Sequence, residues 1–446
     1  MKSPIKVYAP NLAHRTDRRA SLLRQFEART EFQLAIIPAI ERKNGAWGLW
    51  QTFYAVVKEE HEADTPYFIF CEDDHVFTEY YDYHLLCDCI ARADALQADI
   101  LSGGMSWVKN PVAICKGLFR VSSFTGMQFT VVFNRFYDTI LKSKTEEGHV
   151  TDVFLSSLAK RMFVMYPYIS VQQDFGYSDV TSRNNEHGRV PALFCNVQKW
   201  MSKIAKVYDF YAAIKGNASA MLQHFSPEDC FIPTYVINLP QRTDRWQHIK
   251  DQFAGHEEFS MQRVEAVTHS VGAVGLWLSI RKIIEQAEAN GEDLVLICED
   301  DHIFTERYDR RRFMQQVYMA GCLGTNLLMG GIGGFGDMQP VGNGLYWVDW
   351  CWCTQFMVVY RNAFRLILDA EFAENDVADE FISKLCPNKL VTYPFISVQK
   401  EFGYSDATPA NKNGGIEKFF LKASNKITYY AESATLSAQI SLNEDP

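Results

Sequence analysis

The sequence predicts an α/β protein made of two similar tandem domains, each with a mostly parallel sheet flanked by helices. The first observation behind this prediction is an internal repeat: the offsets from Asn11 to Asn238 and from Glu72 to Glu299 are both 227. The second is that short apolar runs, which suit buried strands, alternate in each half with helix-length segments. A repeat of this length indicates two complete domains rather than the stacked units of a solenoid.

The length of the chain agrees with this division. Its 446 residues correspond to two to four domains at roughly 100–200 residues each. We expect a first domain over 1–187, a helical linker over 188–230, a second domain over 231–414, and a C-terminal helix and tail over 415–446.

Composition narrows the class of function. The net charge of −10 disfavours a nucleic-acid partner, which usually requires a basic face. The 11 cysteines include no CxxC pair, and the two CxC pairs lack partners at zinc spacing, so we expect reduced thiols. The sequence has no signal-peptide pattern and no run of about 18 apolar residues, which predicts a cytoplasmic protein without a transmembrane helix.

Each half opens with a strand that ends in Asn-Leu and leads into Arg-Thr-Asp-Arg. Arginines in the first turn of a helix oppose its dipole, so we expect them to face an anion. The alternative is a solvated helix face. The residues concerned are Asn11, Arg15 and Arg18 in the first half and Asn238, Arg242 and Arg245 in the second.

A Gly-x-x-Gly sequence precedes the next helix in both halves, at Gly45 to Gly48 and at Gly272 to Gly275. It lacks the third glycine and the acidic residue of a dinucleotide-binding fingerprint. We interpret these glycines as a close approach of two backbone segments near the site, or as the turn before the helix.

An acidic cluster follows a buried apolar run in each half, as Cys-Glu-Asp-Asp-His. Three acids at the end of one strand repel one another strongly unless a cation lies among them. The carboxyl end of a strand in an open α/β sheet is also where ligands bind. We therefore expect a divalent metal ion and a phosphate-bearing substrate at Glu72, Asp73 and Asp74 and at Glu299, Asp300 and Asp301.

The segment from Arg189 to about Met221 is predicted to be helical, with several lysines among aromatic and aliphatic residues. A helix lying on a membrane surface has this pattern, which leaves a peripheral membrane contact open. A linker helix packed between domains is the interpretation we favour. A corresponding helix is expected from Ile416 to about Glu432.

Taken in order, these motifs resemble glycosyltransferase family 25, which includes bacterial lipooligosaccharide galactosyltransferases and collagen β-galactosyltransferases. The resemblance rests on the Asn-Leu-x-x-Arg-x-Asp-Arg opening, the Gly-x-x-Gly and the Glu-Asp-Asp cluster, and it covers nearly all of both halves. It implies two GT-A-like, Rossmann-related domains, a UDP-galactose or UDP-glucose donor, inversion at the anomeric carbon, and Mn²⁺ or Mg²⁺ as the ion.

The resemblance also assigns roles to residues. The Asn and Arg residues of the opening fall in the nucleotide-binding part, and Asp74 and Asp301 fall where the family's acidic motif meets the metal. The chain departs from the family after Gly-x-x-Gly, where a common Ser-His is replaced by Thr52-Phe53 and by Ser279-Ile280.

An inverting transfer needs a general base for the acceptor hydroxyl. Our candidates are the shared late acids Asp152 and Asp379, followed by Asp179 and Asp406. Tryptophans can stack on an acceptor sugar, although most large aromatic residues belong to the core. The candidates for stacking are Trp50, Trp277, Trp347 and Trp352.

The sequence therefore predicts a hexosyltransferase with a nucleotide-sugar donor and a glycan or glycolipid acceptor. If only one half is active, we expect it to be the second, because the opening of the second half is closer to the family's pattern. One alternative, motivated by the missing His, is an inactive pair of domains that bind a nucleotide or a sugar. Another is a glycosyltransferase acting on modified nucleic acid, which the acidic net charge disfavours.

Overall fold

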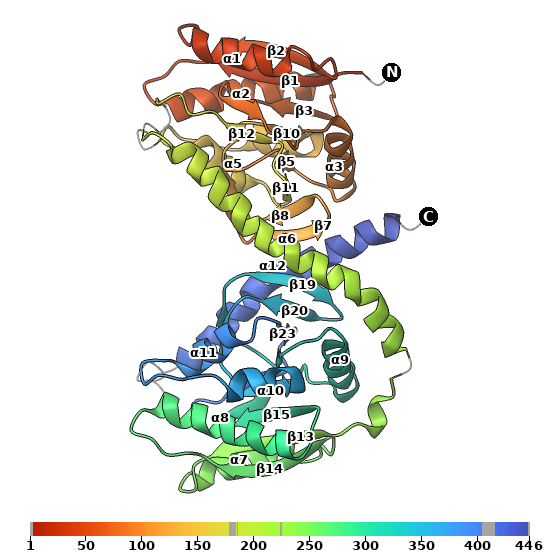
Figure 1. Ribbon diagram of the computed structural model, residues 1–446. Coiled ribbons are helices and arrows are strands. Elements are labelled where there is room, and N and C mark those ends of the chain that lie inside the picture. Colours follow the sequence, from red (N-terminus) through yellow and green to blue (C-terminus); the bar gives the residue numbers. More distant parts are fainter. Residues whose placement is uncertain (1–2, 178–183, 185, 224, 404–414, 445–446) are drawn as a thin grey trace. The chain divides into compact units, whose positions relative to one another are not determined.

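The computed structural model describes residues 3–177, 184, 186–223, 225–403 and 415–444 (Figure 1). The chain divides into two compact units, Met1–Lys206 with Thr435–Pro446, and Val207–Ala434. Both boundaries fall inside long helices, α6 (Arg189–Leu222) and α12 (Gly415–Glu444). The second of these helices is longer than its sequence pattern predicts.

The first unit is built on an eight-stranded sheet in the order β2-β1-β3-β10-β5-β11-β8-β7. The pairings leave β8 and β10 antiparallel to the other six strands. The expected α/β class with a mostly parallel sheet is thus confirmed. Its strands are β1 (Ile5–Asn11), β2 (Phe32–Pro38), β3 (Tyr67–Phe70), β5 (Ile100–Ser102), β7 (Val112–Cys115), β8 (Leu118–Val121), β10 (Thr130–Phe133) and β11 (Met162–Met165).

The second unit repeats this sheet in the order β14-β13-β15-β22-β17-β23-β20-β19. Its first strand begins at Ile232 and that of the first unit at Ile5, so the offset of 227 holds in the structure. The internal repeat is therefore confirmed. The strands are β13 (Ile232–Asn238), β14 (Phe259–Glu265), β15 (Leu294–Glu299), β17 (Leu327–Met329), β19 (Met338–Gly342), β20 (Leu345–Val348), β22 (Phe356–Tyr360) and β23 (Lys389–Thr392).

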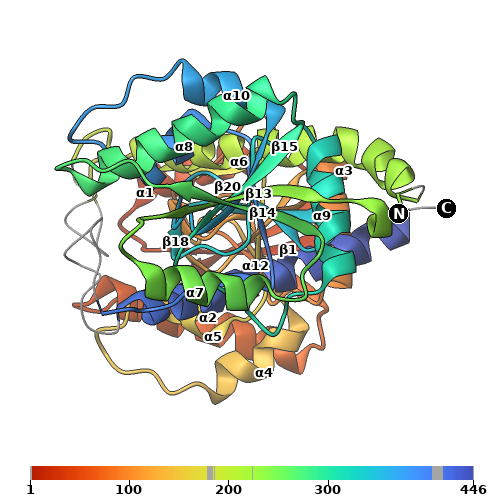
Figure 2. The same ribbon diagram turned by 90° about the horizontal axis from the view of Figure 1, so that it is seen from below.

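Helices cover both faces of each sheet. Figure 2 shows α8 and α10 on one side of β13 and β14, with α7 on the other. The helices of the first unit are α1 (Thr16–Phe26), α2 (Gly45–Glu62), α3 (Tyr83–Ala95), α4 (Asn134–Lys142) and α5 (Thr151–Leu158). Those of the second are α7 (Thr243–Phe253), α8 (Gly272–Ala289), α9 (Arg310–Cys322), α10 (Arg361–Leu368) and α11 (Ala378–Leu385).

Short two-stranded ribbons complete each unit, and the first strand of one ribbon in each unit directly follows the acidic cluster in the sequence. In the first unit β4 (His75–Phe77) pairs with β12 (Ser170–Gln172), and β6 (Trp107–Lys109) pairs with β9 (Ser123–Thr125). In the second unit β16 (His302–Phe304) pairs with β24 (Ser397–Gln399), and β18 (Gly334–Phe335) pairs with β21 (Cys351–Trp352). A 3₁₀ turn, η2 (Pro227–Asp229), precedes β13.

The apolar runs before the acidic clusters are buried, as predicted. Phe68, Ile69 and Phe70 of β3 have no exposed surface, because helices cover both faces of this central strand. Each acidic cluster is therefore anchored by a rigid strand.

The helix α6 contributes buried apolar residues to each unit. Phe194, Met201 and Ile204 are buried in the first unit, and Tyr211 and Ala218 are buried in the second. The two parts of α6 therefore belong to different units. In the part of the chain that the structure describes, no helix is both long and apolar enough to cross a bilayer.

Candidate active sites

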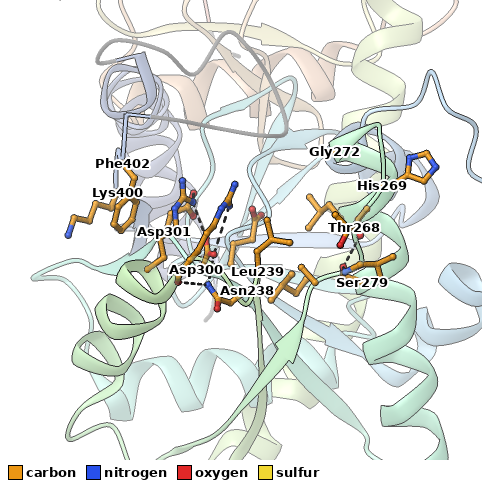
Figure 3. A pocket seen from close by; sticks show the side chains of 18 of the residues that line it. Asn238, Leu239, Thr268, His269, Gly272, Ser279, Asp300, Asp301, Lys400 and Phe402 are labelled. Carbon is orange, nitrogen blue, oxygen red and sulfur yellow. Dashed lines mark hydrogen bonds and ion pairs between the residues drawn. The ribbon is translucent and has the colours of Figure 1, made fainter.

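Each unit contains a cavity at the carboxyl ends of its central strands. The cavity of the first unit has a volume of about 860 Å³ and contains the acidic cluster Glu72, Asp73 and Asp74. The cavity of the second has a volume of about 410 Å³ and contains Glu299, Asp300 and Asp301. Figure 3 shows the second cavity, with Lys400 and Phe402 on one side of Asp300 and Asp301 and with Thr268, His269 and Ser279 on the other.

The predicted Asn and Arg residues of the first unit converge on Asp73. Asn11 donates from Nδ2 to Asp73 Oδ2 over 3.0 Å, and Arg18 Nη1 lies 3.1 Å from Asp73 Oδ1. Arg18 Nη1 also lies 3.1 Å from Asp74 Oδ2, so one guanidinium bridges two acids. Arg15 Nη1 is 3.6 Å from Asp73 Oδ2.

The second unit reproduces this arrangement. Asn238 donates to Asp300 Oδ2 over 2.8 Å, and Arg245 Nη1 lies 2.9 Å from Asp300 Oδ1. The contacts of Arg245 with Asp301 (3.8 Å) and of Arg242 with Asp300 (4.0 Å) are longer than their counterparts.

The anion that these arginines face is thus a carboxylate of the protein itself. Arg18 and Arg245 are about 5% exposed, so the alternative of a solvated helix face is wrong for them. Aromatic rings cover their outer sides: the Arg18 guanidinium lies 4.9 Å from the Phe175 ring, and that of Arg245 lies 4.6 Å from Phe402.

The last acid of each cluster keeps one oxygen without a protein partner. Oδ1 of Asp74 and Oδ1 of Asp301 are buried and have no hydrogen-bond partner among the described residues. Burial raises the pKa of Asp74 to about 6, and repulsion from Asp73 adds to this against the attraction of Arg18. Burial, followed by repulsion from Asp300, likewise raises the pKa of Asp301 to about 6.

The first acid of each cluster is even less able to ionise. Burial raises the pKa of Glu299 to about 8, and Asp301 and Asp379 add repulsion. Burial and repulsion from Asp74 and Asp152 also raise the pKa of Glu72 well above its usual range. Neutral donors reach both glutamates: Gln172 Nε2 lies 3.0 Å from Glu72, and Thr354 Oγ1 lies 2.9 Å from Glu299.

These features test whether a divalent cation fits. Buried carboxylate oxygens that repel one another, one of them without a partner, are the donor set that Mg²⁺ or Mn²⁺ prefers. Among the described residues, however, no three His, Cys, Asp or Glu side chains form a group that would hold an ion by themselves. The residues therefore fit an ion bound by one or two carboxylates and completed by phosphate oxygens and water, which is the usual situation for Mg²⁺.

The late acids Asp152 and Asp379 lie in the first turns of α5 and α11. Asp152 lines the cavity of the first unit, and burial raises its pKa. Its Oδ2 accepts from the backbone N–H of Gly126 over 2.7 Å, as that of Asp379 does from Cys353 over 3.0 Å. The remaining candidate bases, Asp179 and Asp406, lie outside the described residues.

The Gly-x-x-Gly segments allow a close backbone approach, as one of the two interpretations proposed. A Cβ at Gly48 would lie 2.1 Å from the Ile40 carbonyl oxygen, and one at Gly275 would lie 2.6 Å from that of Val267. Thr52 and Ser279 fasten the same loops by accepting from the N–H groups of residues 40 and 267 at 2.9 and 2.8 Å.

The position of the missing family His does not face the cavity. Phe53 and Ile280 are buried, and Phe53 packs edge-on against Phe70 at 5.1 Å. An apolar residue there serves the core, so its presence says little about the chemistry of the site.

The His that ends each acidic cluster is structural. His75 and His302 are buried, and each has Nδ1 at 2.8 Å from a serine hydroxyl, Ser170 or Ser397. Burial lowers the pKa of both imidazoles to about 3, so they are neutral. These contacts join the cluster to the ribbon strands β12 and β24, which explains why the late Ser-Val-Gln sequence occurs in both halves.

Three of the four tryptophans proposed for stacking belong to the core. Trp50, Trp277 and Trp347 are buried, whereas Trp352 is 41% exposed. Sequence reasoning missed Trp107, which is 46% exposed and lines the first cavity.

Sequence reasoning also missed a difference between the two cavities. Arg42 and Lys43 line the first, where Thr268, His269 and Ser270 occupy the corresponding loop in the second. Lys400 lines the second cavity at the position of Gln173. The sequence could have indicated this difference, because these residues differ between the two halves within stretches that otherwise repeat.

No protein-family model and no curated protein sequence matches the chain. Among solved structures, A197 from STIV matches with a TM-score of 0.28 and 14% identity over 40% of this chain and 87% of that one. UDP-glucose pyrophosphorylase matches in its apo form (TM-score 0.25, 8% identity, 44% of this chain, 82% of that one). The complex of UDP-glucose pyrophosphorylase with UDP-glucose matches with a TM-score of 0.26 and 9% identity over 44% of this chain and 99% of that one. Likeness at these scores supports no inference about activity.

Proposed function

We propose that the chain is a metal-dependent, inverting glycosyltransferase that moves a hexose, galactose or glucose, from a UDP-sugar to a glycan or another hydroxyl acceptor. The proposal combines the motif resemblance, which implies GT-A-like domains, with the chemistry of the acidic clusters.

The observation that carries the proposal is the unpartnered, buried Oδ1 of Asp74 and of Asp301, each in an acidic cluster within a cavity. A buried carboxylate oxygen without a protein partner is costly unless a cation or water binds it, which supports a metal ion at this place. A divalent ion bound there supplies charge neutralisation for the diphosphate leaving group.

The chain's own residues prepare this place. Asn11 and Arg18 hold Asp73 in a fixed position, so that Asp74 is presented to the cavity in one orientation. Arg42 and Lys43, which line the same cavity, supply positive charge for a nucleotide phosphate.

Asp152 is the base that we propose in the first unit. Burial raises its pKa, which makes this carboxylate a stronger base than a free aspartate. The two backbone N–H groups of Gly126 and Val153 orient the carboxylate, which then removes the proton of the acceptor hydroxyl.

The test is hydrolysis and transfer from a panel of nucleotide sugars with Mn²⁺, combined with calorimetry of UDP binding. We expect turnover with UDP-galactose or UDP-glucose and its loss in the combined variant Asp74→Asn and Asp301→Asn. Asp88→Asn in α3 is a matched control away from the cavities. Unchanged turnover in the combined variant would contradict the metal-site assignment.

Other outcomes support the alternatives. UDP binding without turnover on any acceptor would indicate an inactive binding pair. Salt-sensitive DNA binding would favour a nucleic-acid acceptor.

A further inference from the structure

A tryptophan occupies the same place on a short ribbon in both units, but it comes from opposite strands. In the first unit Trp107 of β6 lies opposite Thr125 of β9. In the second unit Gly334 of β18 lies opposite Trp352 of β21. With the offset of 227, Trp107 corresponds to Gly334 and Thr125 to Trp352, so the large and small residues are exchanged across the pair.

The ribbon of the first unit is held rigidly against α5. Ser156 Oγ accepts from the Phe124 N–H over 3.2 Å and donates to Ser123 Oγ over 2.9 Å. The N–H of Gly126, next to Thr125, donates to Asp152. These hydrogen bonds therefore join the ribbon that carries Trp107 to the helix that carries the proposed base.

Trp107 shares its cavity with Asp74 and Asp152. The lining of this cavity also includes Leu12, Arg42 and Lys43, which follow β1 and β2. Within the sheet, strand β3 lies between β1 and β5. Strand β3 precedes the acidic cluster, and β5 leads to Trp107. The cationic side chains suit the phosphates of a nucleotide, whereas the uncharged indole suits the apolar face of a ring.

An indole that is 46% exposed on a rigid ribbon has a flat, electron-rich face available to a ligand. The C–H face of a pyranose ring complements such a surface, while the hydroxyl groups at the ring's edge reach polar groups nearby. We infer that Trp107 is the platform for the acceptor's terminal pyranose, which places a sugar hydroxyl beside Asp152. This inference rests on the proposed function and specifies the acceptor as a glycoside.

The second unit supplies an internal control. Among the described residues, the lining of its cavity includes neither Trp352 nor Asp379. Cys353 stands at the position of Gly126, and its side chain packs against Gly333. The Trp352 indole is therefore exposed outside the cavity that holds Asp301.

The experiment uses the full chain and its variants Trp107→Ala, Trp107→Phe and Trp352→Ala. Binding of methyl β-galactoside and methyl β-glucoside at millimolar concentration is read by saturation-transfer difference NMR, with and without UDP and Mn²⁺. UDP affinity is measured by calorimetry on the same samples, which also reports correct folding.

We expect Trp107→Ala to weaken glycoside binding at least about tenfold, Trp107→Phe to keep most of it, and Trp352→Ala to match the unaltered chain. UDP affinity should change less than about twofold in all three. A loss of UDP affinity in Trp107→Ala would overturn the inference, because the indole would then stack on the nucleobase. Glycoside binding that is undetectable in the unaltered chain, or unchanged in Trp107→Ala, would overturn it as well. Failure of UDP to bind the unaltered chain contradicts the proposed function instead, and the glycoside measurement without nucleotide still tests Trp107.

Discussion

The backbone N–H of Gly126 lies 2.7 Å from Oδ2 of Asp152 and fixes this carboxylate at the wall of the first cavity. The corresponding pair in the second unit is Cys353 and Asp379, at 3.0 Å. Cys353 has a φ of +77° and Gly126 one of +96°, so both units need the left-handed conformation here. A glycine adopts it without strain, whereas the cysteine does not.

The replacement Asp152→Asn should abolish the base while keeping the contact with Gly126, because the amide oxygen still accepts the hydrogen bond. We expect kcat for transfer to fall by about 10²–10⁴-fold, with UDP affinity unchanged. The matched variant Asp379→Asn measures the share of the second unit. If transfer by Asp152→Asn equals that of the unaltered chain, Asp152 is not the base.

The replacement Arg18→Met should destabilise the first unit by about 3–5 kcal/mol, because it leaves Asp73 and Asp74 buried without their bridging cation. The double variant with Asp73→Asn should lose less stability than the sum of the losses of the two single variants, by more than about 1 kcal/mol. Urea unfolding measures both effects, and Arg24→Met on the exposed side of α1 is the control. Strict additivity would show that the ion pairs do not determine the cost.

The pKa of Glu299 predicts a pH-dependent gain from Glu299→Gln. With a usual value near 4.5 and a folded-state pKa of about 8, the protonated acid favours the fold below pH 4.5, and this stability is lost as pH rises to about 8. The free energy of unfolding of the variant should therefore exceed that of the unaltered chain by a margin that grows from pH 5 to pH 8. At pH 8 this margin is on the order of 3 kcal/mol.

The measurement for Glu299→Gln is urea unfolding at several pH values with a chelator present. Glu285→Gln on the exposed face of α8 should change stability by less than about 0.5 kcal/mol. A constant difference between Glu299→Gln and the unaltered chain across this range would refute the predicted ionisation.

A side chain at Gly48 in α2 or at Gly275 in α8 should destabilise the fold, because each faces a backbone oxygen. Gly48→Ala places a Cβ 2.1 Å from a backbone oxygen, so we expect a loss of about 2–3 kcal/mol and weaker UDP binding as the loop shifts. Gly275→Ala, at 2.6 Å, should cost less. Gly216→Ala in α6 has open space around its Cβ and should stabilise by about 0.5–1 kcal/mol. Thermal unfolding compares the three, and equal effects would rule out the steric explanation.

Much of the site follows from sequence because it is built on repeated, locally ordered segments. The residues Asn11, Arg18 and Asp73 stand at strand ends and at a helix start, so topology alone brings them to one edge of the sheet. Their partners could not be predicted, since nothing local distinguishes an arginine that binds substrate from one that neutralises a carboxylate.

The tryptophans show the opposite case. Trp50 and Trp107 are the same residue type, yet one is buried and the other is 46% exposed. Exposure depends on which elements pack around a side chain, and these come from distant parts of the chain.

The sequence by itself determined the duplication, the α/β class and the acidic clusters at the ends of buried strands, because periodicity and repeated spacing are properties of the linear chain. Only the tertiary structure decided that Arg18 and Arg245 neutralise Asp73 and Asp300 and that one oxygen each of Asp74 and Asp301 has no partner among the described residues. It also decided that the cavity of one unit reaches its late acid, whereas that of the other, as far as the described residues line it, does not. These outcomes depend on distances and burial between segments far apart in sequence, which set the cost of each charge and the space left for a ligand.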